Sequence, residues 1–273
     1  MSSRAELTLG YVILGVFSLI ALLPVAGIVF TALQDPDGFA AFGSIDGLHF
    51  SNFTTAWDEA NFGTYLRNSV FVAVVVVSVA SLLSILAGYA FGLMRFRGST
   101  LLFYVFLLGL MVPMEAIIVP LYYEMRDTWK LQNTYWSIIL PQIATSVAFG
   151  TFWMRTYFRS VPRSLVEAAR LDGASSWFTL WRVLLPLAKP AVLTMGVLLF
   201  MWTWNEFLLV LVMITDDGKL TAPLGLSVFQ GRNTSDLTLM AAGSVIVALP
   251  VIVVYVFLQR HFIRGMLSGA VKG

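Results

Sequence analysis

The pattern of apolar residues constrains this chain more than any other feature. Six runs, each about as long as the 20 residues with which a helix crosses a bilayer, cover 9–33, 69–94, 101–123, 136–158, 190–214 and 238–259. Only 12% of the 273 residues are charged, against about 25% in an ordinary soluble domain. We therefore expect an all-α membrane protein with six transmembrane helices, built as a single transmembrane domain over residues 1–273 without a separate soluble domain.

The distribution of arginine and lysine predicts the orientation of these helices, because positive residues collect on the cytosolic side. With the N-terminus in the cytosol, 12 of the 17 basic residues lie inside: Arg4, Arg95, Arg97, Arg155, Arg159, Arg163, Arg170, Arg182, Lys189, Arg260, Arg264 and Lys272. Both termini are then cytosolic. The first apolar run is far longer than the core of a signal peptide, so we expect it to be retained as a helix.

The residue content argues against several kinds of site. The chain has no cysteine, and its two histidines, His49 and His261, fall on opposite sides of the membrane in this orientation, so neither a thiol site nor a metal site is expected. No Gly-x-x-x-x-Gly-Lys-Ser/Thr loop is present to hold a nucleotide phosphate. We expect no cofactor in this chain, no nucleic-acid partner, and an energy source on another chain.

The cytosolic segment of residues 164–186 has the pattern of a short helix, a tight turn and a second helix, followed by proline. Ser164 and Glu167 have the S-x-x-E spacing of a capping box at a helix start. Gly173 supplies the left-handed residue on which helices commonly end. The alternative is an amphipathic helix on the membrane surface, with Arg170 and Arg182 against anionic lipid.

This segment resembles the Glu-Ala-Ala signature of permease subunits of bacterial ABC importers. In that signature a glycine follows after three residues, and an aliphatic residue and Leu-Pro come later. The matching residues are Glu167, Ala168, Ala169, Gly173, Val183, Leu185 and Pro186, with Asp172 directly before the glycine. Valine stands at 183 where isoleucine is more usual. The resemblance implies that the segment couples the membrane helices to a cytosolic ATPase.

Over essentially its whole length the chain is similar to carbohydrate-uptake ABC permeases, specifically the maltose-type second permease subunit. The similarity rests on NFGTYLRNS before the second span, GYAFGLMRFRG after it, VPMEAIIVPLY, WNEF and the C-terminal LPVIVVYVFLQRHFIRGMLSGAVKG. It implies the type I ABC importer permease fold in a bacterial inner membrane. It also implies a second permease subunit, two cytosolic ATPases that bind ATP and Mg, and an extracytoplasmic sugar-binding protein.

Two acidic residues at membrane depth are candidates for a translocation pathway. An ionisable side chain in hydrocarbon costs about 2.5–3.5 kcal/mol on the mildest scales, so Glu115 and Glu206 should face a cavity or a partner. Near Glu206, Trp202 and Trp204 offer aromatic faces on which a sugar ring could stack, and Asn205 offers an amide that could hydrogen-bond its hydroxyls. The alternatives are a carboxylate that hydrogen-bonds a neighbouring helix and tryptophans that belong to the interfacial belt.

The outer loop of residues 215–237 is rich in Gly, Asp, Thr and Asn, a composition typical of an adaptable, exposed segment. We expect it to contact an external binding protein, with Gly218, Pro223, Gly225 and Gln230 as candidate contacts. The first outer loop, residues 34–68, carries spaced aromatic residues that favour a short amphipathic helix.

Glycine and proline predict two features of packing. Gly88 and Gly92 form a G-x-x-x-G pattern that allows close helix contact. Prolines inside the spans remove a helical hydrogen bond each and are expected to bend them; they are Pro24, Pro113, Pro120, Pro141 and Pro250.

Other functions remain open at this point. The nearest is an ABC permease for a solute that is not a sugar. An ion-coupled secondary transporter would use a buried acid such as Glu206, but six spans are few and residues 164–186 would go unexplained. A channel subunit lacks a recognisable selectivity-filter loop, and an intramembrane enzyme lacks a paired nucleophile and base.

Overall fold

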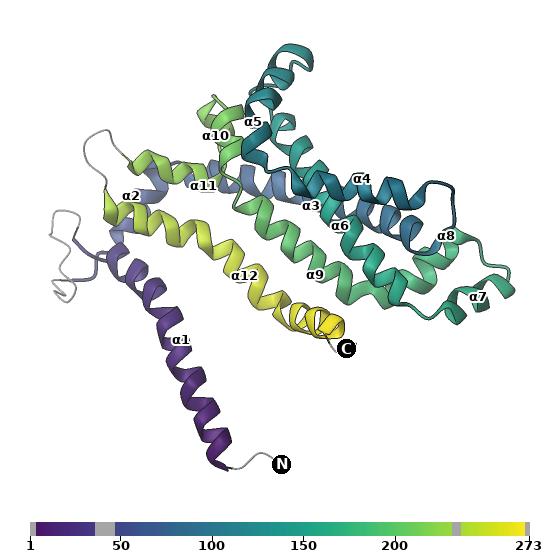
Figure 1. Ribbon diagram of the computed structural model, residues 1–273. Coiled ribbons are helices and arrows are strands. Elements are labelled where there is room, and N and C mark those ends of the chain that lie inside the picture. The colour runs from purple at the N-terminus through teal and green to yellow at the C-terminus, as the bar shows by residue number, and fades with distance from the viewer. Residues whose placement is uncertain (1–3, 36–46, 231–235, 271–273) are drawn as a thin grey trace. The chain divides into compact units, whose positions relative to one another are not determined.

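The computed structural model describes residues 4–35, 47–230 and 236–270, except for the side chains of Ala5 and of 260–270 (Figure 1). The described residues are mainly helical. The chain divides into two compact units, which we call unit 1 (Met1–Thr64 and Gly225–Pro250) and unit 2 (Tyr65–Leu224 and Val251–Gly273).

Within the described residues, five helices are long and apolar enough to cross a membrane, and a bent pair supplies a sixth candidate. The five are α1 (Arg4–Ala32), α3 (Phe62–Leu93), α6 (Trp136–Ser160), a helix from Ser176 to Trp204, and α12 (Leu237–Ala270). The predicted all-α fold with six spans is confirmed. In α1 none of the most apolar window is buried within the chain, as expected for a helix whose surface faces lipid or another protein.

The third span, predicted over 101–123 with a bend at Pro113, consists of two helices that meet at this proline. α4 (Ser99–Met111) stops before Pro113, and α5 (Met114–Tyr123) continues into a π-helical turn, η1 (Glu124–Thr128), at an angle of 92° to α4. Proline offers no N–H to the helix, and its ring pushes the preceding residue out of the helical conformation. Val112 is accordingly extended, with φ −85° and ψ 112°.

The fifth span also differs from the predicted range of 190–214. Its helix consists of α8 (Ser176–Phe178), the π-helical turn η2 (Thr179–Leu184) and α9 (Leu185–Trp204), and a short helix, α10 (Leu208–Met213), follows after an interruption. Pro186 is the second residue of α9, next to η2, where the regular hydrogen-bond ladder is already shifted, and the helix runs through it.

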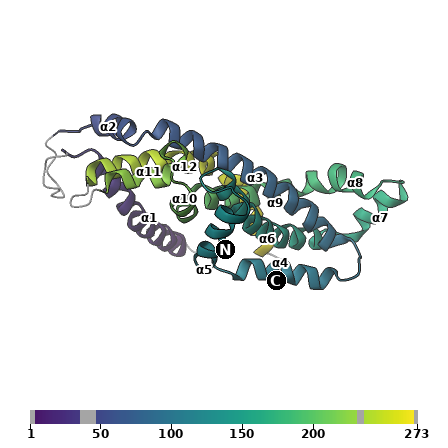
Figure 2. The same ribbon diagram turned by 90° about the horizontal axis from the view of Figure 1, so that it is seen from above.

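Small residues bring α3 and α6 into close contact in unit 2 (Figure 2). A Cβ atom on Gly88 would lie 2.5 Å from Met154 Cβ and 2.9 Å from the backbone N of Arg155. One on Gly92 would lie 3.0 Å from Phe158 Cβ. The close contact predicted at both glycines is confirmed, and it leaves Met154 and Phe158 fully buried in a core cluster.

Unit 1 contains the short amphipathic helix expected in the first outer loop, α2 (Ser51–Glu59). The buried Asn52 side chain donates to the carbonyl oxygens of Ala32 at 3.0 Å and Gln34 at 2.8 Å, which ties α2 to the end of α1. Phe62 is also buried in this unit and lies beside the ring of Phe229.

Candidate functional site

The predicted helix, turn and helix of the 164–186 segment are present in unit 2. α7 (Arg163–Leu171) packs on η2, and Val166 shares one buried cluster with Leu180 and Leu184 of η2 and with Met154 and Phe158 of α6. In both views α7 and α8 project from one end of unit 2, away from α10 (Figures 1 and 2). The segment is therefore a protruding element with a buried root.

α7 ends in a Schellman turn at Gly173. The Gly173 N–H donates to the Arg170 carbonyl at 3.0 Å, and the Ala174 N–H donates to the Ala169 carbonyl at 2.9 Å, which are the two bonds that define this turn. Gly173 has φ +78°, and a Cβ atom there would meet nothing within 4 Å. The predicted left-handed residue is confirmed, and only its backbone conformation restricts what could replace it.

The capping box predicted at the start of α7 is wrong. The helix begins at Arg163, one residue before Ser164, and its N-cap is Pro162 without a side-chain bond. Pro162 has an extended ψ of 129°, so the proline itself directs the chain into the helix. Ser164 is then already a helical residue, and the Glu167 side chain is exposed on the surface of α7.

The outer surface of this segment carries large apolar side chains beside its charged ones, although it projects from the unit. Leu171 is 89% exposed and Trp177 63% exposed, and Phe178 is exposed as well. Exposed apolar side chains of this size are typical of a protein contact. The two alanines differ, since Ala168 is exposed and Ala169 is buried. The sequence did not single out Leu171, Trp177 or Phe178, because large apolar residues carry no signal in a chain that is 58% hydrophobic.

A pocket of about 230 Å³ lies where both interrupted spans meet α6. Its polar lining residues are Gln142, Thr145, Ser146, Thr203 and Glu206, and its aromatic ones are Phe149 and Trp202. Val112, at the break between α4 and α5, also lines it. Non-helical backbone at membrane depth is tolerated where it lines a cavity, and interrupted helices commonly mark solute sites in transporters. The two helix breaks therefore meet at one candidate site.

Glu206 both lines this pocket and caps the helix that follows. Its Oε1 accepts a hydrogen bond from the Leu209 N–H at 2.8 Å, which satisfies one of the unpaired amides at the start of α10. Trp202 lines the same pocket, with its ring centroid 4.7 Å from that of Phe149. The other pathway candidates lie outside the pocket lining: Trp204 is buried, whereas Asn205 and Glu115 are exposed.

We predict that Glu206→Leu lowers the free energy of unfolding by about 1 kcal/mol, the usual cost of losing a helix cap, whereas Glu206→Gln leaves it nearly unchanged. Glutamine keeps the side-chain oxygen that accepts from Leu209. Thermal unfolding of the purified protein in detergent measures the difference, with Glu115→Leu as the control at an exposed acid. Equal stability of Glu206→Leu and the unmodified chain would contradict the capping role.

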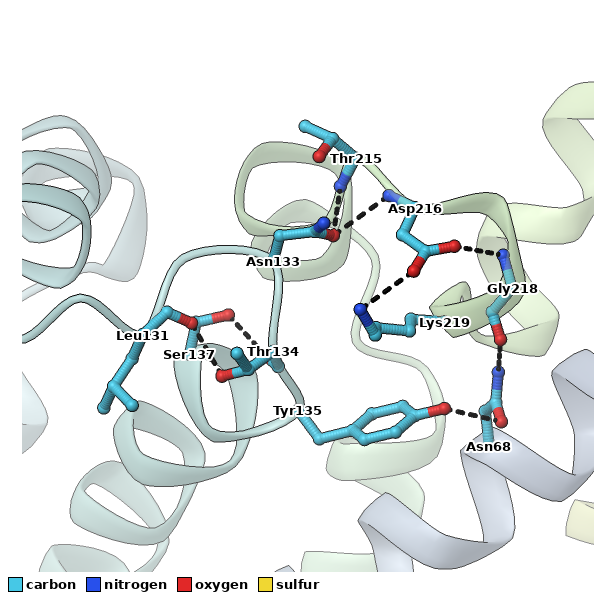
Figure 3. Close-up of polar contacts among 10 residues, drawn as sticks. All are labelled: Asn68, Leu131, Asn133, Thr134, Tyr135, Ser137, Thr215, Asp216, Gly218 and Lys219. Atoms are coloured by element: carbon cyan, nitrogen blue, oxygen red, sulfur yellow. Dashed lines mark hydrogen bonds and ion pairs between the residues drawn. The ribbon is translucent and has the colours of Figure 1, made fainter.

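A buried asparagine in α3 fixes the loop that follows α10 (Figure 3). Asn68 donates from Nδ2 to the carbonyl oxygens of Gly218 at 3.0 Å and Leu220 at 2.9 Å. Its Oδ1 accepts from the Tyr135 hydroxyl at 2.9 Å. The side chain is 3% exposed, and its amide joins three parts of unit 2 that are distant in sequence.

A second asparagine fixes the start of the same loop (Figure 3). Asn133, with φ +60°, accepts the N–H groups of Thr215 at 3.1 Å and Asp216 at 3.0 Å through its Oδ1. Asp216 in turn accepts from the Gly218 N–H and pairs with Lys219 at 2.8 Å, and these contacts, the Lys219 ammonium foremost, hold the pKa of its carboxyl below the usual value. Residues 215–220 are therefore a fixed turn rather than the adaptable loop that composition suggested.

The four predicted binding-protein contacts differ in accessibility. Gly218 and Gln230 are exposed, Pro223 is half-buried, and Gly225 is buried at the end of α11 (Ala222–Gly225). The predicted contact loop continues through residues 231–235, which lie outside the described part of the chain. Gly218 and Gln230 are the accessible members of the set.

We predict that Asn68→Asp lowers the free energy of unfolding by about 2 kcal/mol, because it removes both N–H donors and leaves two carbonyl oxygens facing a carboxylate. The change is nearly isosteric, so packing stays the same. Asn205→Asp is the matched control, since Asn205 also donates to a carbonyl, that of Met201, but is exposed. Thermal unfolding of both variants tests this prediction. A melting temperature of Asn68→Asp equal to that of Asn205→Asp would show that the Asn68 network contributes nothing to stability.

Comparison with known proteins places these features in a family. The profile described as binding-protein-dependent transport system inner membrane component matches residues 80–268. The arabinooligosaccharides transport system permease protein AraQ of Halalkalibacterium halodurans is 30% identical over 273 residues, which cover 98% of this chain and 96% of AraQ. The diacetylchitobiose uptake system permease protein NgcG of Streptomyces coelicolor is 30% identical over 275 residues, which cover 99% of this chain and 91% of NgcG.

A solved structure agrees with the sequence comparison. In the crystal structure of a bacterial ABC transporter involved in the import of the acidic polysaccharide alginate, one chain matches with a TM-score of 0.81 and 26% identity, covering 96% of this chain and 99% of that one. The profile match extends over more than half of the chain, and full-length relatives reach 30% identity. This multi-pass membrane protein therefore belongs to the family of binding-protein-dependent transport system inner membrane components, the permeases of ABC transporters.

Proposed function

We propose that this chain is one permease subunit of an ATP-driven importer for a sugar or an oligosaccharide. The observation that supports the solute class is its full-length similarity to permeases named for arabinooligosaccharides and diacetylchitobiose. The pocket has compatible chemistry, because Trp202 and Phe149 offer ring faces while Gln142 and Glu206 offer hydrogen-bonding groups. Sugar rings stack on aromatic faces through their apolar surfaces and hydrogen-bond through their hydroxyls.

In this proposal the chain works with three kinds of partner. A second permease completes the pathway, two cytosolic ATPases bind ATP and Mg, and an extracytoplasmic binding protein delivers the solute. The orientation predicted from the basic residues places the α7 end in the cytosol and the end that carries residues 215–220 outside. Gly218 and Gln230 are then available to the binding protein, and Glu167, Ala168, Asp172 and Gly173 to an ATPase.

The packing offers a route from α7 to the pocket. Val166 of α7 shares a buried cluster with Met154 and Phe158 of α6 and with Met195 and Leu199 of α9. Both α6 and α9 also line the pocket. A rigid displacement of α7 by a closing ATPase pair would therefore move the pocket walls, as in other domain-closure transitions. Leu185, at the start of α9, packs against this buried cluster and belongs to the route, whereas Pro186 beside it is exposed.

Uptake by reconstituted vesicles tests the proposal. The chain is purified together with the subunits that co-purify with it, and uptake of labelled oligosaccharides is measured with ATP on the ATPase side. We expect uptake that requires ATP, the ATPase and loaded binding protein. Uptake that persists without the ATPase and collapses with a proton or sodium ionophore would favour a secondary transporter instead.

A solute panel separates the two parts of the proposal. Amino acids, peptides and oligosaccharides are offered to the same vesicles with the binding protein present. ATP-dependent uptake of an amino acid or peptide, with none of any sugar, would reject the sugar assignment and leave the importer assignment intact.

A further inference from the structure

A large basic cleft lies at the α7 end of unit 2. It has a volume of about 1000 Å³ and is formed by the end of α3, the turn into α4, the end of α6 and α7. Six arginines line it: Arg95, Arg97, Arg155, Arg159, Arg163 and Arg170. They come from two stretches of the sequence about 60 residues apart, 95–97 and 155–170, so the fold, and not a single local run of charge, brings them together.

The charge of this cleft is not balanced within the described part of the chain. The one acidic residue in its lining is Glu167. The ion pairs among the described side chains are Arg126–Asp127 and Lys219–Asp216, and neither involves a cleft residue. The positive charges of the clustered arginines repel one another. A bound anion relieves this repulsion, so a basic cluster of this kind favours anion binding. Guanidinium groups in particular match the bidentate geometry of phosphate oxygens.

One arginine is fixed as part of the cleft wall. The Arg155 guanidinium lies over the Phe103 ring, 3.7 Å from its centroid, and its Nε donates to the Phe91 carbonyl at 3.3 Å. The remaining five arginines are exposed. Their heads are therefore accessible to a ligand, while Arg155 is already oriented by its neighbours.

The cleft borders an apolar, exposed surface. α4 starts at the cleft with Ser99 and Thr100 and then exposes Leu101, 69% accessible, together with Leu102 and Val105. Met94 and Phe96, which line the cleft, are exposed as well. A ligand that fits both surfaces has an anionic head and an apolar tail. A free phosphate, or an acidic side chain of a soluble partner, would use only the basic part.

We propose that this cleft binds the headgroup phosphate of an anionic phospholipid, whose acyl chains lie along α4. Basic pockets between transmembrane helices on the cytosolic side are suited to such headgroups, and the predicted orientation places the cleft on that side. The site requires that the chain spans a membrane, and it does not depend on which solute is transported. Lipid at this position contacts the root of α7 directly through Arg163 and Arg170.

Native mass spectrometry of the full-length chain in detergent tests the site. The protein is titrated with phosphatidylglycerol and, separately, with phosphatidylethanolamine of identical acyl chains. We expect phosphatidylglycerol to bind at least ten-fold more tightly. The variant Arg97→Gln/Arg159→Gln should lose roughly ten-fold or more of this affinity. A second pair, Arg95→Gln/Arg163→Gln, should behave in the same way, and all four side chains are exposed, so folding is preserved.

The matched control is Arg182→Gln/Lys189→Gln. It removes two positive charges from the same predicted side of the membrane, and both residues are exposed and lie outside the cleft lining. We expect it to bind phosphatidylglycerol like the unmodified chain. An equal loss in the cleft and control variants would overturn the proposal, because the effect would then be general charge attraction.

Two further results would overturn the lipid assignment. Inorganic phosphate that displaces phosphatidylglycerol at equal concentration would identify a site for free phosphate. Loss of a co-purifying ATPase from the Arg97→Gln/Arg159→Gln variant, with phosphatidylglycerol binding unchanged, would identify a protein-docking surface. Retention of the ATPase together with loss of phosphatidylglycerol binding supports the proposal.

Discussion

Gly88→Val is expected to lower the free energy of unfolding by about 3 kcal/mol, which corresponds to a decrease of about 5–10 °C in the melting temperature. The first added carbon alone would lie 2.5 Å from Met154 Cβ and 2.9 Å from the Arg155 backbone nitrogen. Because one of these neighbours is backbone, a rotamer change cannot relieve the overlap. α3 and α6 must move apart, and the core around Met154 and Phe158 loosens with them.

Thermal unfolding of the purified protein measures this effect, and Gly196→Val is the matched control. Gly196 also lies within a long helix, α9, but a Cβ atom there would meet nothing within 4 Å. We expect Gly196→Val to change the melting temperature little. Similar losses in the two variants would mean that valine in a helix, and not the contact between α3 and α6, causes the destabilisation.

The sequence predicted the features that depend on local composition. Apolar runs of sufficient length identify spans whatever their neighbours are, and Gly88 and Gly92 predicted a close helix contact because only a small residue permits one. Gly173 predicted a left-handed turn for a similar reason. These signals work because each is carried by a few residues that are close together in the sequence.

Pro113 predicted a bend in the third span but not a complete break, and the interruption of the fifth span at Glu206 was missed, because hydropathy measures the preference for lipid and not helical continuity. The residues around Pro113, MVPM, are apolar, so the hydropathy average conceals a bend of 92°. A proline alone does not decide whether a helix is interrupted, since Pro120 and Pro190 lie inside continuous helices. At Glu206, the carboxylate suggested a buried pathway group, but the structure shows that it also caps α10, a role that depends on where the preceding helix ends.

The polar network around Asn68 was missed for a different reason. Asn68 bonds to residues 150 and 152 positions later in the chain, and no local pattern distinguishes such an asparagine from a surface one. The capping box shows the opposite error. Ser164 and Glu167 have the correct spacing, but Pro162 already starts the helix, so the pattern lies one residue inside it.

Ala168→Trp is expected to insert into the membrane normally and to reduce ATP-driven uptake by more than ten-fold. Ala168 is exposed on α7, so the indole does not disturb the fold. If the α7 surface docks on an ATPase, as the proposed function requires, a bulky side chain at its small face would prevent close contact. Interface energy is concentrated in a few buried residues, and the neighbouring Leu171 and Trp177 are the apolar side chains available for such contact.

Gly173→Val tests the same surface through the backbone, and Gly98→Val is its matched control. The two glycines have φ of +78° and +80°, and at neither would a Cβ atom meet another atom within 4 Å. The conformational cost of a side chain, about 1–2 kcal/mol, is therefore the same at both. We expect Gly173→Val to lose the co-purifying ATPase and ATP-driven uptake, because it disturbs the turn that ends α7, whereas Gly98→Val retains both. Full ATPase retention and full uptake in both Ala168→Trp and Gly173→Val, normalised to membrane levels, would reject the α7 surface as the coupling site.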